Sequence, residues 1–147
     1  MNSVNDTLIA FLSVMSAAFA LHLVLKRDQT RRRHEEQRRR EIAALTGLKD
    51  ELETNLQLCR RILNSAAPDA EKTCVFKTSH WREQGGSFPL SREELAQNER
   101  AYDFFEAMNG AGSASGHFSI SALKNGREET EKSLRIVDAA LSDLRDA

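Results

Sequence analysis

An uncharged, apolar segment near the N-terminus constrains this chain more than any other feature. Residues 8–25, LIAFLSVMSAAFALHLVL, contain no Asp, Glu, Lys or Arg. An α-helix rises about 1.5 Å per residue, so a helix over this segment is roughly 27 Å long and matches the hydrocarbon thickness of a bilayer. Lys26 and Arg27 follow it directly. The apolar segment therefore predicts a single transmembrane helix, preceded by a short tail over residues 1–7.

Two other interpretations fit the same segment. Residues 18–20, Ala-Phe-Ala, have the small-x-small form of a signal-peptide cleavage site. The residues before them include Asp6 and no Lys or Arg, which is not typical of a signal peptide. A buried core helix is the third interpretation, although a domain of this size has little material to surround such a helix on all sides. The transmembrane helix is favoured, and His22 is interpreted as a neutral imidazole near the interface rather than a proton or ligand site.

A strongly basic segment, residues 26–40, follows the apolar segment. It contains eight Lys or Arg side chains and three acidic ones, a net charge of +5, whereas residues 41–147 carry a net charge of −5. Positively charged flanks of membrane helices stay in the cytoplasm. The asymmetry therefore predicts a membrane protein with its N-terminus outside and its C-terminal domain in the cytoplasm. The residues expected to set this topology are Lys26, Arg27, Arg31, Arg32, Arg33, Arg38, Arg39 and Arg40.

The same basic residues are expected to contact anionic lipids. Each Lys or Arg close to an anionic surface contributes about 1 kcal/mol of attraction. An arginine-rich helix can also bind nucleic acid. No aromatic residue interleaves with these arginines, and the segment directly follows an apolar one. The lipid bilayer and its anionic lipids are therefore the predicted partners, and nucleic acid is not expected.

Residues 41–147 show the periodicity of a small helical domain. Apolar residues recur at spacings of three or four over residues 41–65, 92–108 and 119–145, which predicts three helices. The predicted fold is all-α: a transmembrane helix continues through the basic segment into a long helix, and two further helices pack against its lower half as a small antiparallel bundle. The side chains expected in the core are Leu52, Leu56, Tyr102, Phe105, Leu134 and Leu141.

Local signals predict where two of these helices begin and end. Ser91 and Glu94 have the spacing of a capping box, which marks a helix N-terminus. Asn109-Gly110 is expected to end that helix, because glycine is common just past a helix C-terminus. The following glycine-rich residues, 110–116, are expected to form a flexible connector. Asn125-Gly126 is expected to interrupt or bend the last helix.

The region between the first two predicted helices, residues 69–90, is the least regular. It holds the only tryptophan, Trp81, together with Phe88 and a predicted short extended piece at residues 74–76. Both aromatic side chains are expected to pack onto the helices. Contact of Trp81 with a partner protein is the alternative, because exposed tryptophans are common in protein interfaces.

A search for reactive groups favours no enzyme class. Cys59, Cys74, His80 and His117 have no zinc-binding spacing. No serine or cysteine nucleophile motif is present, and the acidic residues fall on helix faces expected to be solvated. We therefore expect no catalytic residue, no metal and no cofactor.

The chain resembles a group of small, uncharacterised bacterial single-pass inner-membrane proteins. The resemblance is carried by the order of apolar segment, arginine-rich segment and the L-x-x-E-L-x-x-N-L pattern at residues 48–56. It implies an inner-membrane location and a helical cytoplasmic domain, and it brings no catalytic residue. The expected function is a membrane-tethered interaction or accessory module that binds a protein partner or forms a homo-oligomer. A holin-like or toxin-like membrane-active protein, or an enzyme with an unrecognised site, are the alternatives.

Overall fold

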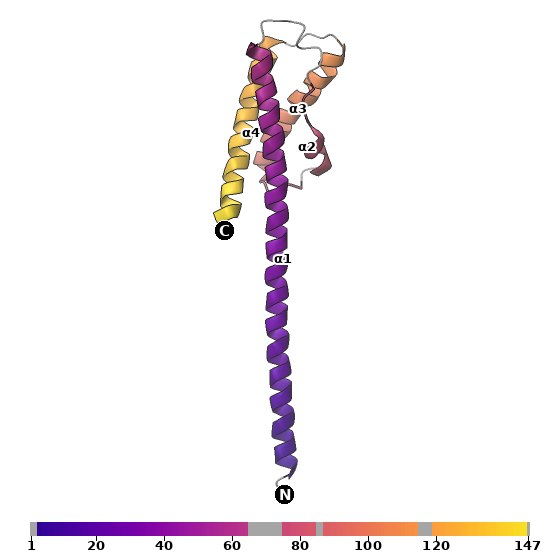
Figure 1. Ribbon diagram of the computed structural model, residues 1–147, viewed down its shortest axis with the longest axis vertical. Helices are drawn as coiled ribbons and strands as arrows, with labels where there is room; N and C mark the ends of the chain where they lie inside the picture. The colour runs from indigo at the N-terminus through magenta and orange to yellow at the C-terminus, as the bar shows by residue number, and fades with distance from the viewer. Residues whose placement is uncertain (1–2, 65–74, 85–86, 115–118, 147) are drawn as a thin grey trace. The chain divides into compact units, whose positions relative to one another are not determined.

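The computed structural model describes residues 3–64, 75–84, 87–114 and 119–146 of the 147-residue chain, with side chains described from Phe11 onward and not at residues 111–114. The described residues form four helices and no strand (Figure 1). These helices are α1 (Ser3–Asn64), α2 (Ser79–Gln84), α3 (Arg92–Ala114) and α4 (Ile120–Asp146). The all-α prediction is therefore confirmed.

The chain divides into two units, Met1–Arg39 and Arg40–Ala147. The described part of the first unit is the N-terminal part of α1. The second unit contains the C-terminal part of α1 and the other three helices. Helix α1 contains neither glycine nor proline before Gly47, and most residues of the basic segment favour helix, so the backbone continues in helical form through that segment.

The predicted transmembrane helix is not supported. Among the described residues, no helix carries an apolar stretch of the length that a membrane crossing needs. The predicted span begins at Leu8, and the side chains of residues 8–10 lie outside those that the structure describes. The side chains of the apolar segment are therefore described from Phe11 to Leu25, and the basic segment begins at Lys26.

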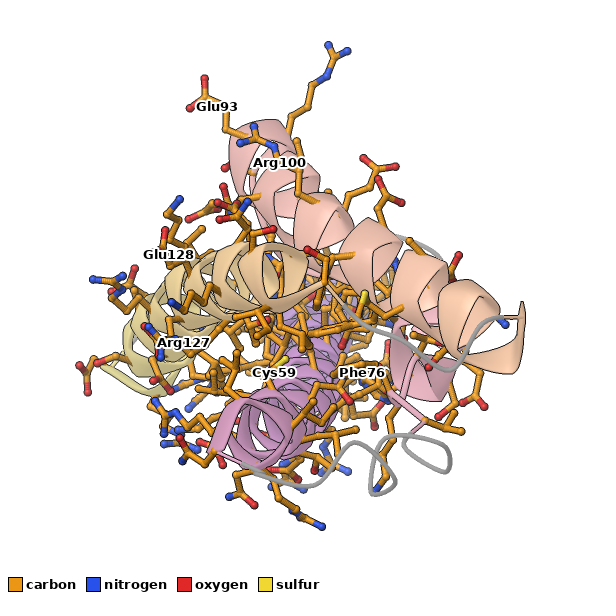
Figure 2. All side chains as sticks on the ribbon, turned by 90° about the horizontal axis from the view of Figure 1, so that it is seen from above. Cys59, Phe76, Glu93, Arg100, Arg127 and Glu128 are labelled. Carbon is orange, nitrogen blue, oxygen red and sulfur yellow. The ribbon has the colours of Figure 1, made fainter. Side chains whose placement is uncertain are left out.

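The second unit is a helical bundle with one apolar core. Figure 2 shows Cys59 and Phe76 lying among side chains between the helices, while Glu93, Arg100 and Glu128 point outward. The predicted core is confirmed except at Leu134, which is only partly buried. The buried apolar side chains are Leu45, Leu48, Leu52, Leu56, Cys59, Ile62, Phe76, Phe88, Ala101, Tyr102, Phe105, Met108, Leu123, Val137 and Leu141.

Helices α1 and α4 are antiparallel, as two ion pairs show. Lys49 Nζ lies 2.6 Å from Asp138 Oδ1, and Arg60 Nη2 lies 3.1 Å from Glu131 Oε1. The residue number of the partner on α4 decreases as the residue number on α1 increases, so the two helices run in opposite directions. Both pairs are largely exposed, so each contributes little to stability. Apolar burial is the main source of stability for this pair of helices.

Close packing of α3 against α4 depends on Gly126. A Cβ atom at this position would collide with the ring of Phe104 on α3. Asn125-Gly126 was expected to interrupt or bend the last helix, and the expected interruption is wrong, because α4 runs without a break from Ile120 to Asp146. The glycine provides space for an aromatic ring and does not break the helix.

The predicted start of α3 is confirmed, and its predicted end is wrong. Ser91 N–H donates to Glu94 Oε2 at 2.7 Å, and Glu94 N–H donates to Ser91 Oγ at 3.3 Å, as expected for a capping box. Hydrogen bonds to its carboxylate from the backbone N–H, and then from the side chain, of Ser91 lower the pKa of Glu94. The helix continues to Ala114 because Gly110 does not adopt the left-handed conformation that ends helices.

Some predictions fall outside the described residues. These are residue 65 at the end of the helix expected over 41–65, residues 115–116 of the expected connector, and Cys74 in the extended piece expected at residues 74–76. In the described part of that region, residues 75–78 form no regular element and lead into α2, a short helix that the periodicity did not predict.

Candidate functional site

The apolar segment is the largest exposed apolar surface among the described residues. All side chains from residue 11 to residue 25 are exposed, and no face of the helix is covered. Large patches of this kind on a protein surface mark contact with a membrane or a partner. The exposed large apolar side chains here are Phe11, Leu12, Val14, Met15, Phe19, Leu21, Leu23, Val24 and Leu25.

The basic segment is also exposed along almost its whole length. Of the predicted site residues in it, only Arg38 is partly buried, and the other seven are exposed. Asp28 Oδ2 pairs with Arg32 Nε at 2.9 Å, and both side chains remain largely solvated. The structure thus places the predicted residues on one helix, where an anionic surface can reach them.

A shallow polar cavity of about 240 Å³ lies in the second unit, between α1 and the chain that leads into α2. Its lining residues are Gly47, Asp50, Glu51, Thr54, Lys77, Ser79 and His80. Four of these, Asp50, Glu51, Lys77 and His80, have ionisable side chains. The structure shows hydrogen bonds that decide how Glu51 and His80 are used.

The Glu51 carboxylate holds the N-terminus of α2. Its Oε2 accepts hydrogen bonds from His80 N–H at 2.9 Å and Ser79 Oγ at 3.3 Å, and its Oε1 accepts one from Trp81 N–H at 3.2 Å. Glu51 is only 5% exposed. The first backbone N–H groups of a helix have no partner within it, so a carboxylate placed here satisfies them and offsets its own loss of solvation. Glu51 therefore acts as a structural anchor for α2.

His80 is fixed on the other side of the same cavity. Its Nε2 lies 2.8 Å from the Ala44 carbonyl oxygen, which can only accept, so Nε2 carries a proton. A Cβ atom at Gly47 would lie against the His80 ring, so glycine is needed for this close approach. The imidazole thus fastens α2 onto α1.

Trp81 packs within the bundle instead of standing free. Its ring stacks on Tyr102 with centroids 4.8 Å apart and on Phe88 with centroids 5.5 Å apart. Burial and then the nearby Glu51 charge raise the pKa of Tyr102. Its hydroxyl is buried and makes no hydrogen bond with the described residues. These contacts place the Trp81 ring against the aromatic side chains of the bundle.

Two asparagines hold the segment before α2. The Asn55 side chain on α1 donates to the Lys77 carbonyl at 2.7 Å and accepts from Lys77 N–H at 2.8 Å. Asn109 on α3 does the same for Phe76, at 2.9 Å and 2.8 Å. Each side-chain amide thus replaces the backbone partner that a β-sheet would supply. Phe76 is thus hydrogen-bonded to α3, and the next residue, Lys77, is hydrogen-bonded to α1.

The hydrogen bonds of Glu51 and His80 in this cavity serve a structural purpose. The Glu51 oxygens and His80 Nε2 are engaged with backbone groups. Within the described ranges, no group of three or more His, Cys, Asp or Glu side chains could hold a metal ion. Burial raises the pKa of the Cys59 thiol to about 11, which makes it a poor nucleophile.

Sequence reasoning assigned no role to Glu51 or Asn55, and it expected Asn109 only to end its helix. A signal for the first two was present: they fall three residues after Leu48 and Leu52, in register with the buried stripe. A polar residue at a buried position needs a hydrogen-bonding partner. Nothing local identifies that partner, because it comes from residues 76–81.

Comparison of the chain with protein-family models, with curated proteins and with solved structures gave no match. No residue role can therefore be transferred from a relative. The functional argument depends on the two exposed segments of α1 and on the bundle described above.

Proposed function

We propose that this protein is a non-enzymatic, membrane-tethered module. The N-terminal part of α1 inserts into a lipid membrane, and the helical bundle lies on the cytoplasmic side of a bacterial inner membrane, where it binds a protein partner or a second copy of the chain. The observation that carries the proposal is the apolar segment, which is exposed on every face in the described residues and is followed at once by basic residues.

Two physical arguments support the tether. An apolar helix that is exposed on all sides gains free energy by leaving water, at about 25 cal/mol per Å² of apolar surface. A helix that only packs against one partner needs a single apolar face and keeps polar residues on the other. The segment has no such polar face, so surrounding lipid explains its composition better than one protein partner does.

The bundle supports the role of an accessory module. The buried Glu51 and Asn55 and the partly buried Asn109 all form hydrogen bonds that hold α2 and the segment before it onto the longer helices. Its outer faces are charged, and the acidic character of residues 41–147 keeps such a domain soluble beside a membrane.

The tether is tested by alkaline carbonate extraction of membranes from cells that express the full chain. We expect the protein to stay in the membrane pellet. The variant Val14→Lys/Leu21→Lys should be released, because each lysine at the centre of a membrane helix costs about 2.5–3.5 kcal/mol. The matched control is Gln29→Lys/Glu36→Lys, which adds two lysines at the same spacing in the basic segment and should stay in the pellet.

Two results would refute the tether. One is release of the unaltered chain by carbonate. The other is equal retention of both lysine variants, which would mean that the apolar segment does not hold the protein in the membrane.

A further inference from the structure

The cations of the basic segment are not spread evenly around α1. Residues three, four, seven or eleven positions apart share one face of an α-helix. This spacing places five cations on one half of the helix: Lys26, Arg27, Arg31, Arg33 and Arg38. No acidic residue between positions 26 and 39 lies on that half. These five residues are called the basic face.

The opposite half of the helix has nearly balanced charge. The charged residues on this half have a net charge of −1 and are called the mixed face: Asp28, Arg32, Glu35, Glu36 and Arg39. The ion pair between Asp28 and Arg32, at 2.9 Å, lies on this face. Within residues 26–39 the basic face, in contrast, has a net charge of +5 and holds no carboxylate, and Glu41, three residues after Arg38, is the first acidic residue on the same side of the helix.

This asymmetry is more than membrane topology requires. The positive-inside bias depends on the number of Lys and Arg residues near the apolar segment and not on the side of the helix that carries them. A one-sided arrangement matters only when an anionic surface lies along the helix. The anionic surface that continues from an inserted apolar segment is the layer of lipid headgroups.

We propose that the basic face of α1 binds anionic phospholipid headgroups and that the mixed face does not. This inference rests on the proposed membrane tether. The basic face begins at Lys26, directly after the apolar segment, and Arg38 lies about 18 Å further along the helix. That distance exceeds the Debye length of about 10 Å at 0.1 M salt. The far arginines therefore reach headgroup phosphates only where α1 inclines its basic face toward the membrane surface.

The experiment uses the full chain reconstituted into vesicles of phosphatidylcholine and phosphatidylglycerol. Electron paramagnetic resonance measures the fraction of each spin-labelled lipid that is immobilised by the protein. We expect the unaltered chain to prefer phosphatidylglycerol, and the preference to fall as salt is raised. Arg31→Gln/Arg38→Gln, which removes two of the five cations of the basic face, should clearly reduce this preference.

The matched control is Arg32→Gln/Arg39→Gln on the mixed face. It removes the same charge at the same spacing, with each position moved by one residue, and it should keep the preference for phosphatidylglycerol. Equal losses in the two variants would show that only total charge matters and would overturn the proposal, as would an unaltered chain without any preference. A failure of the tether itself looks different, because the protein would then not sediment with the vesicles.

Discussion

At the scale of single residues, the bundle places ionisable groups where water is scarce. Cys59 is fully buried on the inner face of α1, and Tyr102 is buried on α3 with its hydroxyl near the Glu51 carboxylate. Burial disfavours the charged thiolate and phenolate, so both groups stay neutral to higher pH in the folded state than in the unfolded chain. This difference makes stability depend on alkaline pH.

We predict that stability falls as the pH rises from 9 to 11. The Cys59 thiol has an ordinary pKa of 9.0 and a folded-state pKa of about 11, so the unfolded chain loses this proton first and gains free energy relative to the folded state. The loss attributable to Cys59 reaches about 2–3 kcal/mol at the upper end. Tyr102 acts in the same direction above its ordinary pKa of 10.0. Urea denaturation of the full chain in detergent, followed by Trp81 fluorescence, measures it.

The variant Cys59→Ala isolates the thiol contribution. Its stability should depend less steeply on pH between 9 and 10 than that of the unaltered chain. Parallel stability curves for the two proteins would contradict the assignment of this dependence to Cys59.

At the scale of helices, the packing of α3 on α4 rests on the shape complementarity of Gly126 and Phe104. Gly110, in α3, provides a comparison, because a Cβ atom there would meet nothing within 4 Å. We predict that Gly126→Ala destabilises the bundle by about 1–3 kcal/mol, since the Phe104 ring must shift. Gly110→Ala should stabilise it by about 0.5–1 kcal/mol, because alanine loses less backbone entropy in a helix.

Thermal unfolding of the two alanine variants in parallel tests this contrast. Opposite shifts in melting temperature are expected. A rise for Gly126→Ala would show that Phe104 does not occupy the space that the glycine leaves.

The helical elements also show what local sequence can and cannot predict. The stripe from Leu45 to Leu56 and the capping box at Ser91 are local patterns, and both led to correct expectations. Asn109 was expected to end α3, but its side chain instead bonds to Phe76, a partner 33 residues away in the chain. Contacts over such separations determine the roles of Asn109, Glu51 and α2, and no short-range pattern encodes them.

At the scale of the whole molecule, charge and hydropathy divide the chain more clearly than any motif does. The apolar segment, the basic segment and an acidic bundle follow one another, and each could be read from composition alone. The one-sided charge of the basic segment becomes meaningful only once α1 is known to be helical there.

The central claim is that a membrane holds this bundle on its cytoplasmic side. The most direct test fuses either green fluorescent protein or alkaline phosphatase after Ala147 of the full chain and expresses each fusion in a bacterium. Green fluorescent protein is fluorescent in the cytoplasm, and alkaline phosphatase is active only after export. We predict fluorescence in the membrane fraction and no phosphatase activity. Active phosphatase, or fluorescence confined to the soluble fraction, would contradict the claim.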